Sequence, residues 1–144
     1  MNQHGFTLIE VLLSVAILTL LAGLSLPVYE SFLRRNDLDI TTQSIAMAIR
    51  RAQVHSRGAD GNDTWGIEFL SSGVTLFKGS SYASRTAAYD ETVPLPASVS
   101  LAGFSEVVFS KLSGAPNTTG SITLSSTVND SRTITINAKG LVSY

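Results

Sequence analysis

The chain has 144 residues, 44% of them hydrophobic, a length that allows one ordinary domain with one additional element and argues against a two-domain enzyme. Its formal net charge of −1 at pH 7 gives no electrostatic footprint for a nucleic-acid backbone or an acidic membrane surface. The sequence contains no cysteine, which excludes disulfides, thiolate metal ligands and a cysteine nucleophile.

The N-terminal segment is strongly apolar. Residues 6–29 carry one formal charge, Glu10, and the 19 uncharged residues 11–29 would extend about 28 Å as a helix, which spans a bilayer core. A secretory signal peptide fits less well, because residues 1–5 contain no Lys or Arg, the apolar run is too long, and no clear cleavage site follows it. An ordinary signal anchor explains the length of the run but not the acid within it.

The residues around that acid form a specific pattern. Gly5-Phe6-Thr7-Leu8-Ile9-Glu10, the apolar run and Pro27 resemble the class III signal of type IV pilins and type II secretion pseudopilins. The resemblance implies that a prepilin peptidase cuts between Gly5 and Phe6 on the cytoplasmic side. Residues 1–5 are then a leader that is removed, the new amino group of Phe6 is N-methylated, and the helix of residues 6–29 stays as a membrane anchor that later becomes the filament core.

The resemblance also gives roles to three residues of the anchor. In a filament, the Glu10 carboxylate would neutralise the Phe6 amino group of a neighbouring subunit, and breaking such a buried pair costs about 3–5 kcal/mol, so the pair would favour the correct axial register. The alternative is an acid in the headgroup region. Pro27 has no N–H, so the carbonyl of Gly23 loses its helical partner, and Gly23 is a weak helix former. We predict a soft point from Gly23 to Pro27 that unwinds on assembly, with an ordinary kink as the alternative.

The charges around the anchor do not set its orientation. Lys and Arg normally mark the cytoplasmic side, but the leader has neither, and Arg34 and Arg35 follow the span on the opposite side. The predicted orientation therefore rests on the motif.

Beyond the span, residues 30–57 are predicted to continue the helix as an amphipathic segment. Apolar and small residues recur there at spacings of three and four, with polar residues mainly off that stripe. The stripe consists of Leu38, Thr42, Ile45, Ile49 and Ala52, and the residues off it are Asp37, Asp39, Arg50, Gln53 and Arg57. Gly58 is predicted to end the helix.

Residues 58–144 are predicted to form a β-rich globular head, because the hydrophobic period changes to two. We expect a hairpin from residues 65–69 and 74–77, a loop over residues 79–92, and strands at 99–101, 107–109, 122–124, 134–136 and 140–144. Pro94 and Pro96 exclude a central strand between them. These strands would form one sheet or two small ones on the helix stripe. The predicted fold class is α+β: a long N-terminal helix packed against a small, mainly antiparallel β head, the lollipop plan of pilins.

Several short stretches of the head narrow the resemblance. They resemble the GspH/FimT pseudopilins, the H-type minor pseudopilins of type II secretion and their type IV pilus relatives. The stretches are Arg50-Arg51-Ala52-Gln53-Val54, Trp65-Gly66-Ile67, Leu95-Pro96, Phe109, Gly120-Ser121-Ile122-Thr123-Leu124, Ile134-Thr135-Ile136-Asn137 and Gly140.

This resemblance implies a non-enzymatic structural subunit of the type II secretion pseudopilus, which supports protein export across the outer membrane. The alternative is a minor or major type IV pilus subunit that serves adhesion, twitching or DNA uptake. Either protein would be a single-pass protein of the bacterial inner membrane with its head in the periplasm. Its partners would be the lipid bilayer, the prepilin peptidase, the inner-membrane assembly platform and other pilins or pseudopilins of the same filament.

The sequence offers no catalytic constellation, cofactor motif or metal site. His4 would leave with the leader, and His55 lies near a helix end, where a solvated or dipole-complementing role is expected. Asp60, Asn62 and Asp63 lack the spacing of a calcium loop and predict a polar connection.

Nucleic-acid binding is also disfavoured. Some FimT-like minor pilins take up DNA through a basic C-terminal region, but the last 30 residues here offer only Arg132 and Lys139. That is too few phosphate contacts for DNA binding to be the leading role.

Overall fold

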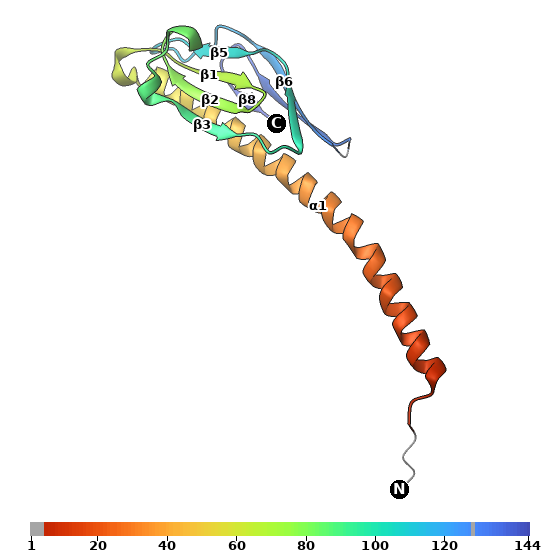
Figure 1. The fold of residues 1–144 in the computed structure, drawn as a ribbon. Coiled ribbons are helices and arrows are strands. Elements are labelled where there is room, and N and C mark those ends of the chain that lie inside the picture. The colour runs from red at the N-terminus through yellow and green to blue at the C-terminus, as the bar shows by residue number, and fades with distance from the viewer. Residues whose placement is uncertain (1–4, 128) are drawn as a thin grey trace. The chain divides into compact units, whose positions relative to one another are not determined.

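One long helix, α1 (Leu8–Arg57), contributes to both units into which the chain divides, Met1–Leu33 and Arg34–Tyr144 (Figure 1). The computed structural model describes residues 5–127 and 129–144, and it leaves the side chains of residues 24–28 and 30 undescribed. We call the second unit, Arg34–Tyr144, the head and describe it separately from the first.

The ends of α1 follow local signals. The Thr7 carbonyl accepts the N–H groups of Glu10 and Val11, at 3.1 and 3.3 Å, and so closes the first turn. At the other end the Gly58 N–H donates to the Val54 carbonyl at 2.9 Å, and Ala59 then turns into the left-handed region at φ 50°. The helix thus ends directly before Gly58, as the sequence predicted.

Within the described residues, eight strands form two four-stranded antiparallel sheets. The first sheet has the order β3-β2-β1-β5 and the second β4-β6-β7-β8. Their bounds are β1 (Trp65–Leu70), β2 (Gly73–Lys78), β3 (Glu91–Pro94), β4 (Val99–Ala102), β5 (Glu106–Phe109), β6 (Gly120–Ser126), β7 (Ser131–Ile136) and β8 (Val142–Ser143). The sequence left open whether the strands form one sheet or two small ones, and the structure has two.

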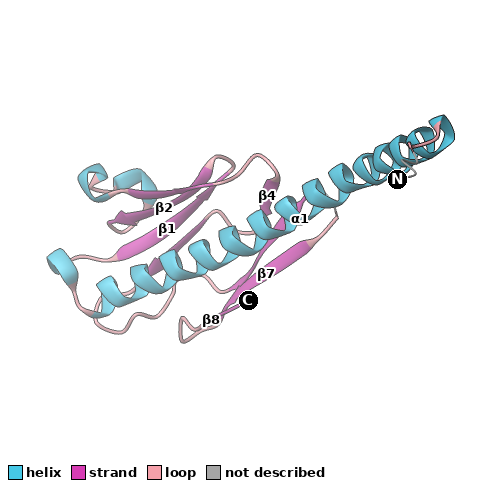
Figure 2. Ribbon diagram, turned by 90° about the horizontal axis from the view of Figure 1, so that it is seen from below, coloured by secondary structure: helices cyan, strands magenta, loops and turns pink. Residues whose placement is uncertain are grey.

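The buried face of α1 joins the two sheets into one core. Figure 2 shows the helix crossing the head with β1 and β2 to one side of it and β7 and β8 to the other. All five residues of the predicted stripe are buried, and the four apolar ones share one hydrophobic cluster with residues of both sheets such as Phe109 and Leu124. The α+β, pilin-like arrangement predicted from the sequence is therefore confirmed.

Gln53 departs from its prediction. We expected it off the buried stripe, but it is only 9% exposed. Its Nε2 donates to the carbonyls of Gly114 and Lys139, both at 2.9 Å. A buried amide with hydrogen-bond partners is physically acceptable, but hydrophobic periodicity does not reveal it, because the partners come from distant loops.

The segment 79–92 is also more ordered than predicted. It contains two 3-10 helices, Tyr82–Ser84 and Ala87–Tyr89, and its last two residues belong to β3, so the prediction of a loop throughout was wrong there. β3 lies at the edge of its sheet, where Pro94 is tolerated because its missing N–H faces away from a partner strand.

Candidate functional site

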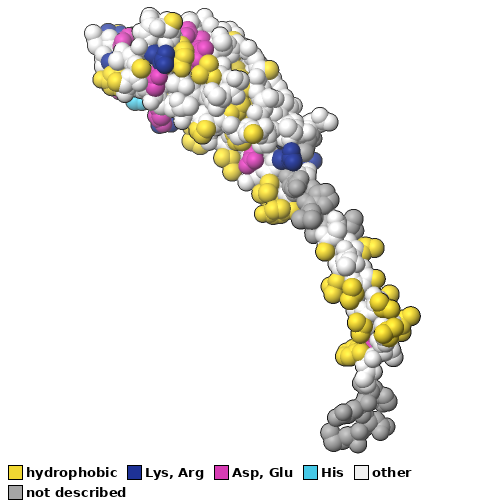
Figure 3. Space-filling model, in the orientation of Figure 1, with side chains coloured by type: hydrophobic (Ala, Val, Ile, Leu, Met, Phe, Trp, Pro, Cys, Tyr) yellow, Lys and Arg dark blue, Asp and Glu magenta, His cyan; other side chains and the backbone are white. Residues whose placement is uncertain are grey.

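The first candidate site is the exposed apolar surface of α1 in the unit Met1–Leu33. Phe6, Leu8 and Ile9 are 75–83% exposed, and the large apolar residues of 11–21 are 52–65% exposed. Figure 3 shows hydrophobic side chains along this part of the helix, whereas the visible face of the head is mainly neither hydrophobic nor charged. A contiguous apolar surface of this kind marks a protein or membrane interface.

Glu10 carries the one formal charge within this surface. It lies in the first turn of α1 with an exposed side chain, four residues after Phe6. A carboxylate in the first turn is stabilised by the partial positive charge of the helix N-terminus, typically by about 0.3–1 kcal/mol. Glu10 is therefore compatible with the isolated helix, and its predicted pairing with a neighbouring subunit would be an additional role.

The two glycines predicted in this segment lie in open space. An added Cβ would meet nothing within 4 Å at Gly5 or at Gly23. The helical backbone runs unbroken through residues 23–27, while the Pro27 side chain lies outside the described residues. The soft point from Gly23 to Pro27 stays a prediction.

Among the residues whose side chains are described, no helical segment is both long enough and apolar enough to cross a bilayer.

The second region of interest is the end of the head at the C-terminus of α1. His55 stacks on Trp65 with 4.5 Å between ring centroids, and its Nδ1 lies 2.8 Å from an Asp60 carboxylate oxygen. Trp65 Nε1 donates to the Asp60 carbonyl at 3.0 Å, so these three residues brace the turn after the helix. The sequence predicted a solvated or dipole-complementing His55 and missed this stacking, since no local pattern links it to Trp65.

Asn62, from the same polar connection, accepts a hydrogen bond from Lys111 Nζ. Within the part of the chain that the structure describes, no three His, Asp or Glu side chains are grouped so as to hold a metal ion. Arg132, considered above for DNA contact, forms an ion pair with Asp39 at 2.9 Å.

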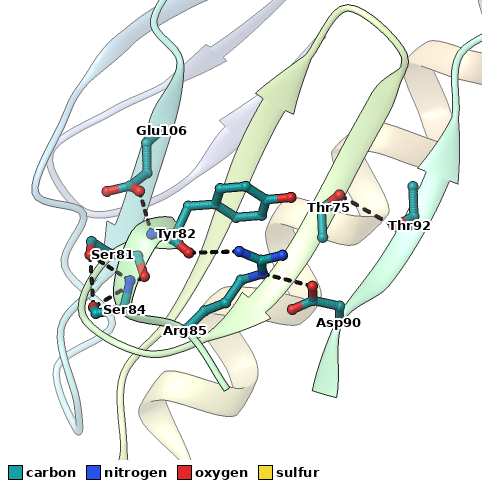
Figure 4. A network of polar contacts seen from close by, with 8 residues as sticks. All are labelled: Thr75, Ser81, Tyr82, Ser84, Arg85, Asp90, Thr92 and Glu106. Carbon is teal, nitrogen blue, oxygen red and sulfur yellow. Dashed lines mark hydrogen bonds and ion pairs between the residues drawn. The ribbon is translucent and has the colours of Figure 1, made fainter. Parts of the chain in front are cut away.

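A polar network covers the outer side of the first sheet (Figure 4). Arg85 Nε pairs with Asp90 at 2.7 Å, its guanidinium lies 3.8 Å from the centroid of the Tyr82 ring, and the Tyr82 N–H donates to Glu106 at 2.7 Å. The charge-assisted bond from the Tyr82 N–H to Glu106 fixes the segment 79–90 on β5.

Glu106 also faces Glu68 directly across the β1–β5 ladder. Partial burial, together with this facing carboxylate, raises the pKa of Glu68 above its ordinary value, although Arg85 opposes the shift. Two like charges opposite one another on a sheet are destabilising, so this pair makes the head sensitive to pH.

Comparison with known proteins identifies the N-terminal site. The family model for the prokaryotic N-terminal methylation motif matches residues 1–26. Searches of curated proteins and of solved structures gave no significant match.

The match covers Gly5, Phe6 and Glu10, whereas Pro27, on which the sequence prediction also rested, lies just beyond it. The motif implies processing by a prepilin peptidase, membrane anchoring through the N-terminal segment and pilus-like assembly partners, and its family is typically structural rather than enzymatic. This chain therefore combines the N-terminal methylation motif of the type IV pilin and pseudopilin class with a pilin-like α+β fold.

Proposed function

We propose that this protein is a minor pseudopilin, a structural subunit of the type II secretion pseudopilus that supports protein export across the outer membrane. The observation that carries the proposal is the methylation motif on a helix whose other half packs on two antiparallel sheets. The resemblance of several stretches to GspH/FimT pseudopilins supports the choice of subunit, and some of these stretches also hold the head together. Ile122, Leu124, Ile134 and Ile136 are core residues, and Trp65 braces the end of the helix.

The first step in this role is hydrolysis of the peptide bond between Gly5 and Phe6. It leaves a carboxylate on Gly5 and a free amino group on Phe6, which is then N-methylated and keeps its positive charge. Both residues are exposed and precede the first helical residue of α1, so the bond between them is accessible to a peptidase.

The second step is assembly. The apolar side chains of residues 6–21 are exposed on the isolated chain and would be buried first by lipid and then by neighbouring anchors. In that water-excluded environment Glu10 would pair with the Phe6 amino group of a neighbour. We further propose that Gly23 to Pro27 is the point at which the anchor yields during packing, since the Gly23 carbonyl has no N–H partner at Pro27.

The assembly role of Glu10 is tested with two substitutions expressed in peptidase-competent cells. Glu10→Gln preserves the size of the side chain and removes its charge, so we expect normal cleavage and membrane insertion but loss of most incorporation into filaments. Glu10→Asp keeps the charge and should retain part of the incorporation. Intact-mass analysis measures cleavage and methylation, and cross-linking in membranes measures incorporation. Full incorporation of Glu10→Gln would disprove the pairing.

The secretion role is tested by deletion of the gene. Loss of export of secreted enzymes with intact piliation supports the proposal, whereas normal export with lost piliation assigns the protein to a type IV pilus. A mature chain that still begins at unmodified Met1 would refute both roles.

A further inference from the structure

The head carries a preorganised surface where α1 ends, built from two turns and one face of the helix. Arg50, Val54 and Arg57 are separated by four and three residues, so they share one helical face, and each is exposed. Leu112 and Leu141 lie on the two turns that the Arg57 side chain contacts, near Gly114 and at the Lys139 carbonyl. We call these five residues together with Lys139 the end surface.

Gln53 holds the two turns of the end surface next to each other. Its amide donates to the carbonyl of Gly114 in one turn and of Lys139 in the other. An added Cβ on Gly140 would lie 2.9 Å from the Gly114 carbonyl oxygen, which confirms the close approach of the turns. Arg57 packs on the first turn, since an added Cβ on Gly114 would lie 2.5 Å from its side chain.

Each turn presents one leucine to solvent on a fixed backbone. Leu112 is 71% exposed although its N–H donates to the Ser56 carbonyl at 2.9 Å and its φ is +67°, a conformation that a leucine rarely adopts. Leu141 is 64% exposed although its N–H donates to the Asn137 side chain at 2.9 Å. Backbone strain and exposed leucines on anchored turns reduce stability without a partner, and they are typical of preformed binding sites.

The basic residues of the end surface differ from most others of the head in their partners. Arg35, Arg51, Arg85 and Arg132 each pair with a carboxylate at 2.7–2.9 Å. Arg50 and Arg57 instead donate to the carbonyls of Val142 and Lys139. Across the described residues, neither these arginines nor Lys139 form an ion pair with a carboxylate of this chain, so three positive charges remain to be neutralised.

We propose that the end surface is a docking site for a protein segment that places carboxylates beside apolar side chains. The leucines and Val54 supply apolar contact, and Arg50, Arg57 and Lys139 supply charge complementarity around it. A second copy of this chain would have to supply other carboxylates, because Asp39, Asp90, Glu91 and Asp130 are already engaged by its own arginines. The exposed leucines favour a protein over a nucleic acid, since nucleic-acid interfaces are more polar.

The test uses the full-length protein in detergent micelles and fluorescence anisotropy of labelled probes. The first probe is a short synthetic peptide with two leucines among glutamates. Two matched peptides replace the glutamates by glutamines or the leucines by serines, and an oligothymidylate serves as the phosphate probe. We expect the first peptide to bind most tightly and its affinity to fall with salt.

Variants of the protein then locate the binding site. Arg57→Gln with Lys139→Gln should weaken binding of the first peptide about tenfold, and Leu141→Ser should weaken it roughly tenfold or more. Leu112→Asn should have a similar effect, and asparagine is chosen because it tolerates the positive φ of this position. Ile40→Ser, at another exposed apolar position more than two turns from Arg50 along α1, is the control and should leave binding unchanged.

Unchanged fluorescence of Trp65 shows that each variant remains folded. The proposal is overturned if the serine peptide binds as well as the leucine peptide, or if wild type and the charge variant bind alike. Preferential binding of oligothymidylate also overturns it, in favour of a nucleic-acid surface.

Discussion

Gln53 offers the sharpest test of how the head is held together. At an ordinary apolar core position Met destabilises less than Ala, whereas at Gln53 we expect Met to destabilise more than Ala. Its amide joins two turns to α1 through hydrogen bonds of 2.9 Å to Gly114 and Lys139. Gln53→Met keeps nearly the same volume and removes both donors. Gln53→Ala removes the donors and also leaves space beside a residue that is 9% exposed.

The magnitude follows from what each replacement leaves behind. Two neutral hydrogen bonds contribute about 1 kcal/mol each, and a buried carbonyl left without a donor costs about 1–3 kcal/mol. Methionine fills the space and keeps water out, so we expect Gln53→Met to lower the free energy of unfolding by about 2–4 kcal/mol. In Gln53→Ala a water molecule can bridge the two carbonyls, so the loss should be smaller, about 1–3 kcal/mol.

Urea unfolding of the full chain in micelles measures these losses, with Trp65, the sole tryptophan, as the fluorescent probe. Trp65 is 5% exposed and stacks on His55, so its emission reports the end of the head that Gln53 holds. Ile49 is the control position, because it is fully buried in apolar surroundings. Ile49→Ala should lower the free energy of unfolding by about 2–5 kcal/mol, and Ile49→Met by less than about 1.5 kcal/mol. If Met is tolerated better than Ala at residue 53 as well, the hydrogen-bond argument is wrong.

Two further predictions concern the first sheet. Burial and the facing Glu106 raise the pKa of Glu68 in the folded protein above its value in the unfolded chain. Glu68 therefore stabilises the fold below its unfolded-state pKa, and this stabilisation is lost as the pH rises through its folded-state pKa. Glu68→Gln should therefore raise the urea midpoint at neutral pH but not near about pH 4, and an equal change at both would contradict this. Gly66→Ala should lower stability by about 1–3 kcal/mol, because its Cβ would lie 2.6 Å from the Phe77 ring and 2.8 Å from the Val107 carbonyl oxygen. An unchanged urea midpoint would show that β1 and its neighbours accommodate the methyl group without cost.

The parts of the fold that the sequence predicted are those determined by local patterns. The hairpin of β1 and β2 follows from alternation around a Gly73 turn, and the buried stripe of α1 follows from spacings of three and four. The end of the helix was also predicted from a local signal, since Gly58 directly follows Arg57, the last helical residue. Each of these features is encoded within a window of a few residues.

The missed features depend on residues far apart in sequence. Gln53 is buried because carbonyls 61 and 86 residues away accept its hydrogens, and β3 forms because β2 offers it an edge. The end surface combines Arg50 with Leu112 and Leu141 in the same way. The sequence alone did not predict that Arg50, Arg57 and Lys139 lie close together, because the turns that Gln53 joins bring Lys139 to the helix.

The two ends of α1 present different chemistry, and this difference limits how the protein can assemble. The N-terminal part exposes apolar side chains from Phe6 to Leu21 with one acid among them, so its burial by lipid or by similar helices is favourable. At the other end the exposed residues are two leucines on anchored turns beside unpaired positive charges, which suits a partner of defined shape and opposite charge. Packing of the anchors alone is therefore insufficient to select a neighbour, because apolar helices are chemically alike, and we expect that selection to depend on the end surface of the head.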